Sequence, residues 1–376
     1  MIVKAFFSNK SSLLFCLENL KEQVSKCFDS YDFLFFSIYP EYTFYNVNSL
    51  IRKIFKTENF IAFNSSNIFI DDEIKIKGVG LFVIKFENKG KISTFINKGC
   101  YVGNLEKVSN YLNENRDKFH LIISNLERTD HFVEEISHKL NYFPVNNIAG
   151  GVIAGVNVNG EERNYIFYDN SILKQGFVIV SFENVEWKIG ISSGFMPYGI
   201  TYKILKANDK RIYFVDDGKH FGYIFKKLLN GIENPDIRYT WYTPIYVLNE
   251  ERGYISSVRT VKNITDEYVE FYASVKEGEF FKLSFATKEE LIEEDKKVAN
   301  RLIEKLKNPE IIFNFSCLAR QYVLEDKQEE EIKTYTNVFN AHLFGFFTAG
   351  EIAPNVKNYR LMFYNETSIP VILKEK

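Results

Sequence analysis

Two reactive groups stand close together near the C-terminal end of this chain, the thiol of Cys317 and the guanidinium of Arg320, and a carboxylate follows at Glu351. Arg320 follows a buried strand and is expected to lie in a loop. A guanidinium binds carboxylates through two parallel hydrogen bonds, so Arg320 could clamp a ligand carboxylate. The same chemistry allows an ion pair with a neighbouring acid inside the protein. Glu351 could receive a ligand ammonium group, pair with Arg320, or accept bonds from backbone N–H groups in a turn.

Cys317 has two interpretations. As a nucleophile it needs a base or a helix terminus that lowers its pKa, and His342 is a candidate base. As a free cysteine it is a small residue that is commonly buried. We favour burial, predict no catalytic residues and expect no enzyme activity. A thiol-dependent enzyme is the alternative hypothesis, and a scaffold that binds only proteins is the third.

Other residues near these groups have the types that line ligand pockets. Gly150, Gly151 and Gly350 could bring backbone N–H groups close to a ligand, or they could allow close packing of strands. They lack the motif context of a nucleotide-binding loop. Phe347 could cover the apolar part of a ligand, and Asn365 could contact it or bond its own turn.

Composition excludes several classes of partner. The chain has 376 residues, 45% of them hydrophobic, and a formal net charge of −2. Nucleic-acid binding needs a basic surface, which this balance does not favour. No stretch reaches the ~18 apolar residues of a membrane span. The 4 cysteines lie far apart without a CxxC motif and the 5 histidines lack ligand spacing. We therefore predict a cytoplasmic protein without a metal, a cofactor or a membrane partner.

One structural unit recurs three times along the chain: a helix, a buried strand, a second helix, a second strand and two further strands. The strands are short continuous apolar runs, typical of sheets that are covered on both faces. The third copy begins with a helix whose start carries a capping box, Thr287 and Glu290. The first and second strands of the copies are expected at 33–38 and 60–63, 119–123 and 147–151, and 311–315 and 343–347.

The pattern predicts an α/β (α+β) fold of two duplicated halves, in which mixed β-sheets pack centrally with helices on the outside. Residues 183–286 differ, because they alternate apolar and polar side chains, as strands with one wet face do. We place the domain boundary after residue 184.

The order of motifs resembles the FIST domain, which has an N-terminal and a C-terminal half. On this resemblance, residues 1–184 form the N-terminal-like domain and residues 185–376 the C-terminal-like domain. The resemblance covers the chain from about residue 33 to its end. The matching segments are 148–151 (IAGG), 166–170 (IFYDN), Gly194, Pro197 and Gly199, 216–218 (DDG), 315–320 (FSCLAR), 345–354 (GFFTAGEIAP) and 363–367 (FYNET).

The resemblance implies a sensory protein that binds small molecules, with amino acids proposed as ligands, and it carries no catalytic residues over to this chain. Three departures from the family's pattern stand out. The N-terminal turn at 62–66 has no glycine, Ala319 stands where glycine is common, and Tyr364 where histidine is common. We expect no attached output domain, and a separate signalling protein is the expected partner.

We therefore expect a small-molecule-binding sensory protein whose ligand is an amino acid or a related carboxylate. Its pocket is expected where the segments 150–151, 317–320 and 345–351 meet, with Arg320 and Glu351 binding the two charges of the ligand.

Overall fold

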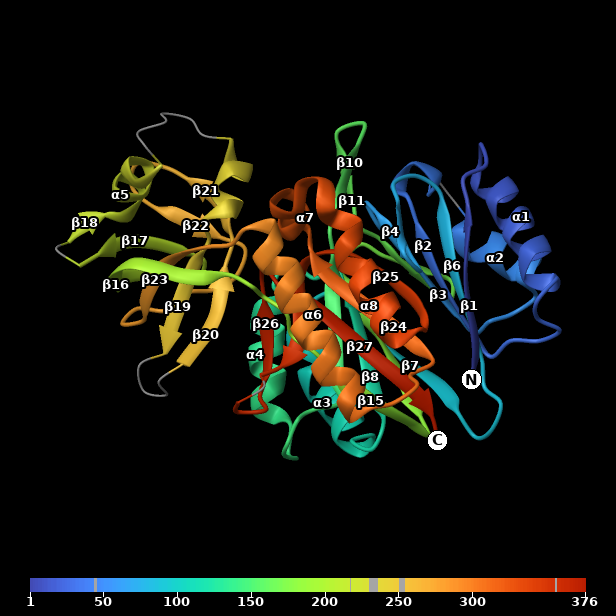
Figure 1. Cartoon of the computed structure of the whole chain (residues 1–376). Helices are drawn as coiled ribbons and strands as arrows, with labels where there is room; N and C mark the ends of the chain where they lie inside the picture. Colours follow the sequence, from blue (N-terminus) through green and yellow to red (C-terminus); the bar gives the residue numbers. More distant parts are fainter. Residues whose placement is uncertain (44–45, 217, 230–235, 250–253, 356) are drawn as a thin grey trace.

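The computed structural model describes residues 1–43, 46–216, 218–229, 236–249, 254–355 and 357–376. Two large sheets pack face to face, helices cover their outer faces, and a third sheet lies to one side (Figure 1). This arrangement confirms the predicted α/β class with mixed sheets at the centre and helices outside.

The first sheet, sheet A, belongs to the N-terminal part of the chain. Its outer face is covered by α1 (Leu13–Ser25) and α2 (Val47–Phe55). Its strands are, in spatial order, β1 (Ile2–Ser8), β6 (Val79–Lys85), β2 (Phe33–Ile38), β3 (Phe60–Asn64), β12 (Ile166–Tyr168) and β13 (Ser171–Leu173).

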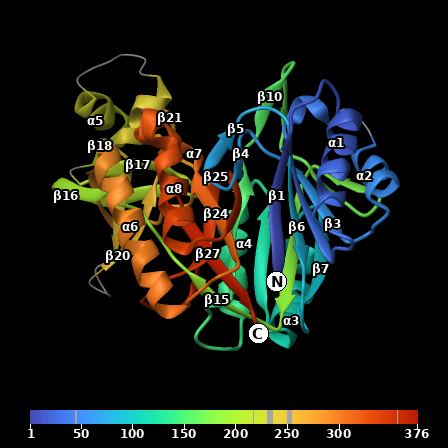
Figure 2. The same ribbon diagram turned by 45° about the vertical axis from the view of Figure 1, so that its right-hand side comes forward.

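The second sheet, sheet B, joins distant parts of the chain. Helices α3 (Leu105–Glu114), α4 (Thr129–Lys139), α6 (Lys288–Lys305) and α8 (Gln328–Phe339) cover its outer face, on the side away from α1 and α2 (Figure 2). Its main path is β15 (Val185–Ile189), β27 (Ser368–Glu375), β24 (Ile311–Cys317), β25 (His342–Pro354), β9 (Ile148–Ile153), β8 (Phe119–Ser124), β14 (Gly176–Glu183) and β7 (Lys91–Lys98). Strands β26 (Leu361–Tyr364) and β4 (Ile68–Ile70) also pair with β25, and β5 (Glu73–Lys75) pairs with β4.

Phenylalanine rings fill the space between sheets A and B. Phe35 of β2 lies 5.4 Å from Phe313 of β24, and Phe82 of β6 lies 5.5 Å from Phe344 of β25, between ring centroids. These strands carry apolar residues on both faces, because one face meets the other sheet and the opposite face meets helices.

The repeated unit appears three times, as the sequence predicts. Each copy supplies two parallel strands and a third strand antiparallel to the first of them: β2, β3 and β6; β8, β9 and β14; β24, β25 and β27. The second and third copies meet where β9 pairs antiparallel with β25. Sheet B therefore takes strands from both sides of residue 184, and the domain boundary placed there stays a prediction.

The third sheet forms from the alternating region of the sequence. Helix α5 (Phe221–Leu228) packs against it, and the 3-10 helix η3 (Ile237–Tyr242) lies between its strands in the chain. Its order is β20 (Tyr254–Arg259), β19 (Ile245–Asn249), β23 (Phe280–Phe285), β16 (Met196–Asn208), β17 (Arg211–Val215), β22 (Val269–Phe271) and β21 (Val261–Ile264), with β18 (Lys219–His220) on β17. A separate ribbon, β10 (Val156–Val158) and β11 (Glu161–Arg163), projects from the body (Figure 1).

Two local expectations were wrong. Arg320 lies on a short helix, α7 (Leu318–Leu324), whose N-cap is Cys317, and not in a loop. Gly350 and Glu351 lie inside β25 and not in a turn, because β9 continues to pair with this part of β25. Among the described residues, no helix combines the length and apolar character needed to cross a membrane.

Candidate functional site

The C-terminal motifs meet at the carboxyl end of β24, where its parallel pairing with β25 stops and β25 continues beside β9. These strands are parallel, and Cys317 at the end of β24 stands beside Thr348 of β25. The turn between β26 and β27 returns to the same place, where the N–H of Cys317 donates to the carbonyl of Thr367 at 2.9 Å. Ligands of open α/β sheets commonly bind at the carboxyl ends of the parallel strands.

A small cavity of about 140 Å³ lies at this meeting point. The second copy, the third copy and the third sheet all contribute to its wall. We call it the Asn365 cavity; its wall consists of Ala154, Gly155, Glu162, Trp241, Thr260, Tyr272, Cys317, Leu318, Ala319, Thr348, Ala349 and Asn365. A wider cleft of about 820 Å³ shares Gly155, Glu162, Tyr272 and Ala349 with it, so the cavity adjoins open space.

Asn365 is the exceptional residue of this wall. It is 1% exposed, and neither its Nδ2 nor its Oδ1 has a hydrogen-bond partner among the described residues. A buried polar group without a partner costs about 1–3 kcal/mol, and native proteins rarely leave one so. The cavity therefore presents an unused donor and an unused acceptor on one side chain.

Glu351 lies directly behind the wall. It accepts from the Thr367 hydroxyl at 2.7 Å and from the Thr367 N–H at 3.3 Å. The Thr348 hydroxyl lies 2.5 Å from Glu351 Oε1 and 3.0 Å from the carbonyl of Ser316. One hydroxyl proton serves one of two acceptors well, so both contacts are satisfied when Glu351 is protonated and donates to Thr348.

A second buried acid, Glu366, lies beside Glu351 and accepts from the Thr260 hydroxyl at 2.8 Å. Burial raises the pKa of Glu351 to about 8, and hydrogen bonds from Thr348 and Thr367 oppose the rise. Burial also raises the pKa of Glu366 to about 8, with a further contribution from the Glu351 charge. Near neutral pH these carboxyl groups therefore hold protons, and the wall near Asn365 carries little charge.

Cys317 lines the cavity as a neutral thiol. Burial, Glu351 and Glu366 raise its pKa well above its ordinary value, although backbone hydrogen bonds from Glu366 and Ala319 oppose the rise. The hypothesis that His342 activates Cys317 is wrong. His342 stands beside Ile311, six strand positions or roughly 20 Å from Cys317, and its Nδ1 contacts Asp71 at 2.9 Å.

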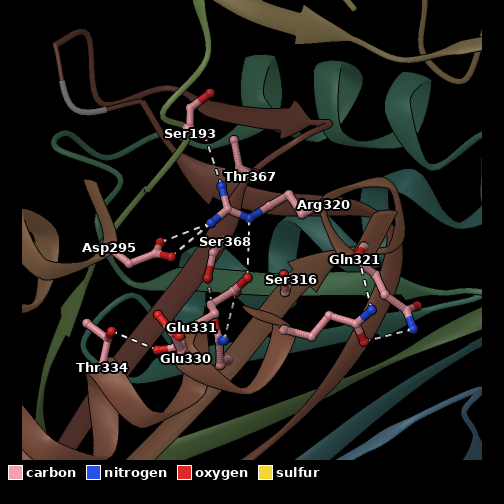
Figure 3. A network of polar contacts seen from close by, with 12 residues as sticks. Ser193, Asp295, Ser316, Arg320, Gln321, Glu330, Glu331, Thr334, Thr367 and Ser368 are labelled. Atoms are coloured by element: carbon pink, nitrogen blue, oxygen red, sulfur yellow. Dashed lines mark hydrogen bonds and ion pairs between the residues drawn. The ribbon is translucent and has the colours of Figure 1, made fainter. Parts of the chain in front are cut away.

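Arg320 faces the protein interior (Figure 3). Its Nη2 donates to both carboxylate oxygens of Asp295, at 3.1 and 3.0 Å. Its Nε donates to Glu331 at 3.4 Å and its Nη1 to the carbonyl of Ser193 at 2.9 Å. The side chain is fully buried, so the geometry favours the internal ion-pair interpretation over the ligand clamp. Arg320 does not line the Asn365 cavity.

The predicted glycines and Phe347 lie away from the cavity and serve packing. A Cβ on Gly150 would stand 1.9 Å from the carbonyl oxygen of Ile122, and one on Gly350 would stand 2.0 Å from the Phe363 ring. Gly151 packs under Thr348 in the same way. The ring of Phe347 packs against the ring of Phe69 on the helix-covered face of sheet B, with 4.7 Å between the ring centroids. The structure thus brings Cys317 and Asn365 into the wall, with Glu351 one hydrogen bond behind it.

Sequence reasoning missed most of the wall. Trp241, Thr260 and Tyr272 come from the third sheet and its connections, which carry no motif that joins them to the C-terminal segments. Thr348 lies within a segment already singled out, but nothing distinguished it from its neighbours. The one available signal was the rarity of tryptophan, since Trp241 is one of 2 in the chain.

Within the part of the chain that the structure describes, one group of side chains has the types that bind metal ions: Asp130, His131 and Asp209. Its acids already have cationic partners, because Lys210 lies 3.2 Å from Asp130 and Arg128 lies 3.8 Å from Asp209. The arrangement is an ion-pair cluster, and a further cation fits it poorly.

Comparison with known proteins finds a family match for both halves of the chain. Residues 32–218 match the FIST N domain and residues 224–354 match the FIST C domain. Over 261 residues, 66% of this chain and 95% of the other, the sequence is 33% identical to an uncharacterized protein of Aquifex aeolicus (strain VF5).

Proposed function

We propose that this chain, which belongs to the FIST family, senses a small molecule that binds in the Asn365 cavity. The role proposed for FIST domains is sensing and signal transduction. The single observation that carries the proposal is the buried amide of Asn365, whose donor and acceptor have no partner among the described residues. A ligand that offers one acceptor and one donor would satisfy both.

The ligand we propose is an amino acid, or a compound of similar size with an adjacent acceptor and donor. A carboxylate oxygen would accept from Asn365 Nδ2, and an ammonium group would donate to Asn365 Oδ1. Glu162, on the side shared with the wide cleft, is a second acceptor for the ammonium group. Trp241 and Tyr272 would pack against the apolar part. The cavity of about 140 Å³ suits small side chains better than large ones.

In this proposal Asn365 takes the role that the sequence assigned to Arg320. A ligand carboxylate is compatible with the nearby acids because raised pKa values keep Glu351 and Glu366 protonated near neutral pH. Cys317 contributes shape to the wall, and its neutral thiol gives no support to the thiol-enzyme hypothesis.

The test is a thermal-shift screen of the purified protein against amino acids and small carboxamides, repeated with Asn365→Ala. A ligand at 100 times its Kd stabilises the folded state by ~2.7 kcal/mol. We expect a saturable shift for the wild type and its loss in the variant. The variant should unfold within about 1 kcal/mol of the wild type without ligand, because the removed amide makes no hydrogen bond.

Asn147 provides a matched control, because it is also 1% exposed. Its amide accepts from Tyr142 at 2.9 Å and donates to the carbonyls of Arg116 at 3.1 Å and Lys118 at 2.8 Å. Asn147→Ala should lower the free energy of unfolding by about 1–3 kcal/mol and keep the ligand response. A wild-type response in Asn365→Ala, or no stabilising compound in the whole panel, would contradict the proposal.

A further inference from the structure

A second cavity, of about 320 Å³, lies between α4, β26 and β20. It is separate from the Asn365 cavity, with which it shares no lining residue. Two guanidinium groups line it, those of Arg259 and Arg360. Arg259 is partly buried at the end of β20, and Arg360 is exposed just before β26.

Three hydrogen bonds hold the guanidinium of Arg259 in place. Its Nε donates to the carbonyl of Ser274 at 2.9 Å, and its Nη1 donates to Ser257 Oγ at 2.5 Å and to the carbonyl of Val258 at 3.2 Å. All three acceptors are uncharged. Within the described part of the chain, Nη2 makes no hydrogen bond and no carboxylate forms an ion pair with this arginine. A fixed guanidinium with free N–H groups is organised in advance for an oxyanion.

Arg360 is also without an ion pair among the described residues. Its backbone is bonded on both sides, because the N–H donates to Asn358 Oδ1 at 3.0 Å and the carbonyl accepts from the Asn355 N–H at 2.8 Å, whereas its guanidinium makes no hydrogen bond with the described residues. Two guanidinium groups of one cavity therefore make no ion pair with the described residues.

The acids around this cavity already have partners. Glu134 pairs with Lys276, and Asp130 lies 3.2 Å from Lys210. Glu279 accepts from the backbone N–H of Lys276 at 2.9 Å. Glu279 therefore pairs with no cation among the described residues, and its charge acts on Arg259 through space. Two unpaired guanidinium groups against this one carboxylate leave the cavity with a net positive charge.

We propose that this cavity binds an oxyanion, the carboxylate or phosphate group of a small metabolite, between Arg259 and Arg360. Nη2 of Arg259 supplies the fixed donor, and the longer reach of the exposed Arg360 lets it close on the bound anion. The two arginines come from different parts of the fold, so the anion would join the third sheet to β26 and α4.

The position of Arg259 next to the first cavity makes this site relevant to sensing. Thr260, the following residue, lines the Asn365 cavity and donates to Glu366. An anion bound by Arg259 therefore contacts the residue before a wall residue of the other site.

The experiment titrates the full chain with inorganic phosphate and with succinate, at ionic strength held constant with sodium chloride, and records the melting temperature. The variants are Arg259→Gln, Arg360→Gln and, as a charge-matched control, Arg116→Gln, which alters an exposed arginine outside the cavity. We expect a saturable shift for the wild type and the control, and an apparent affinity about tenfold weaker in each cavity variant.

A response to succinate alone assigns the site to carboxylates, and a response to phosphate alone assigns it to phosphates. No response to either anion, or an equal response in Arg360→Gln and the control, would overturn the proposal. Because Arg360 is exposed, its variant decides the matter even where Arg259→Gln fails to fold. Asn365→Ala should keep the anion response, so failure of this site and failure of the amino-acid site are distinguishable.

Discussion

Arg320 and Asn365 are both buried polar residues of the C-terminal motifs, with exposed fractions of 0% and 1%. They differ in what surrounds them. Asp295, Glu331 and the Ser193 carbonyl satisfy the guanidinium of Arg320, whereas the amide of Asn365 has no partner among the described residues. The comparison teaches that the charged residue of a motif need not be the ligand-binding one. Unused hydrogen-bonding capacity beside a cavity is the better indicator of a site.

The largest expected effect concerns the protonated acids behind the cavity. The folded-state pKa of Glu351 and of Glu366 is about 8, above the ordinary value of 4.5. Between these values the folded protein binds more protons than the unfolded chain does. The free energy of unfolding should therefore fall as pH rises from about 5 to 8, by up to about 1.4 kcal/mol per pH unit for each acid. Urea unfolding across this range measures it.

Glu351→Gln sharpens this prediction. Its amide can donate to Thr348 and accept from Thr367, so it imitates the protonated acid. The variant should match the wild type near pH 4, below the unfolded-state pKa, exceed it increasingly in stability up to about pH 8, and show a shallower dependence on pH. A variant with the wild-type slope would mean that Glu351 is ionised throughout.

The next largest effect concerns Arg320, each of whose guanidinium nitrogens donates a hydrogen bond. Arg320→Met leaves Asp295 and Glu331 buried without their cation, which should cost about 3–5 kcal/mol in the free energy of unfolding. Denaturant unfolding measures the loss. The control is Arg301→Met, which removes an exposed ion pair with Glu294 and should cost less than about 1 kcal/mol. Equal costs for the two variants would show that the Arg320 network adds little.

The smallest effect is kinetic and concerns the thiols. Cys27 and Cys100 are exposed, whereas Cys16 and Cys317 are buried. Burial raises the pKa of both Cys16 and Cys317, so few of these groups are thiolates near neutral pH. A disulfide reagent added to the folded protein should modify two thiols quickly and the other two only on unfolding. Rapid loss of the Cys317 thiol would revive the enzyme hypothesis.

Local pattern was enough to predict much of the fold. The apolar run at 33–38 coincides with β2, and the expected capping box of Thr287 and Glu290 is present at the start of α6. The threefold repeat was visible because each copy must present the same order of apolar strands and amphipathic helices to its sheet. The same reasoning misplaced Arg320 and Gly350, since a short helix and the continuation of a paired strand depend on contacts with distant segments.

The sequence by itself determined the α/β class, the repeated unit and the FIST resemblance. It could not determine which polar side chains are satisfied. Asp295 and Glu331 reach Arg320 from two other helices, and the wall around Asn365 is completed by Trp241 and Thr260 from the third sheet. A hydrogen bond depends on distances of a few tenths of an ångström between residues far apart in the chain. Only the tertiary structure sets those distances, and with them the difference between an arginine whose hydrogen bonds are satisfied and an asparagine whose amide has no partner among the described residues.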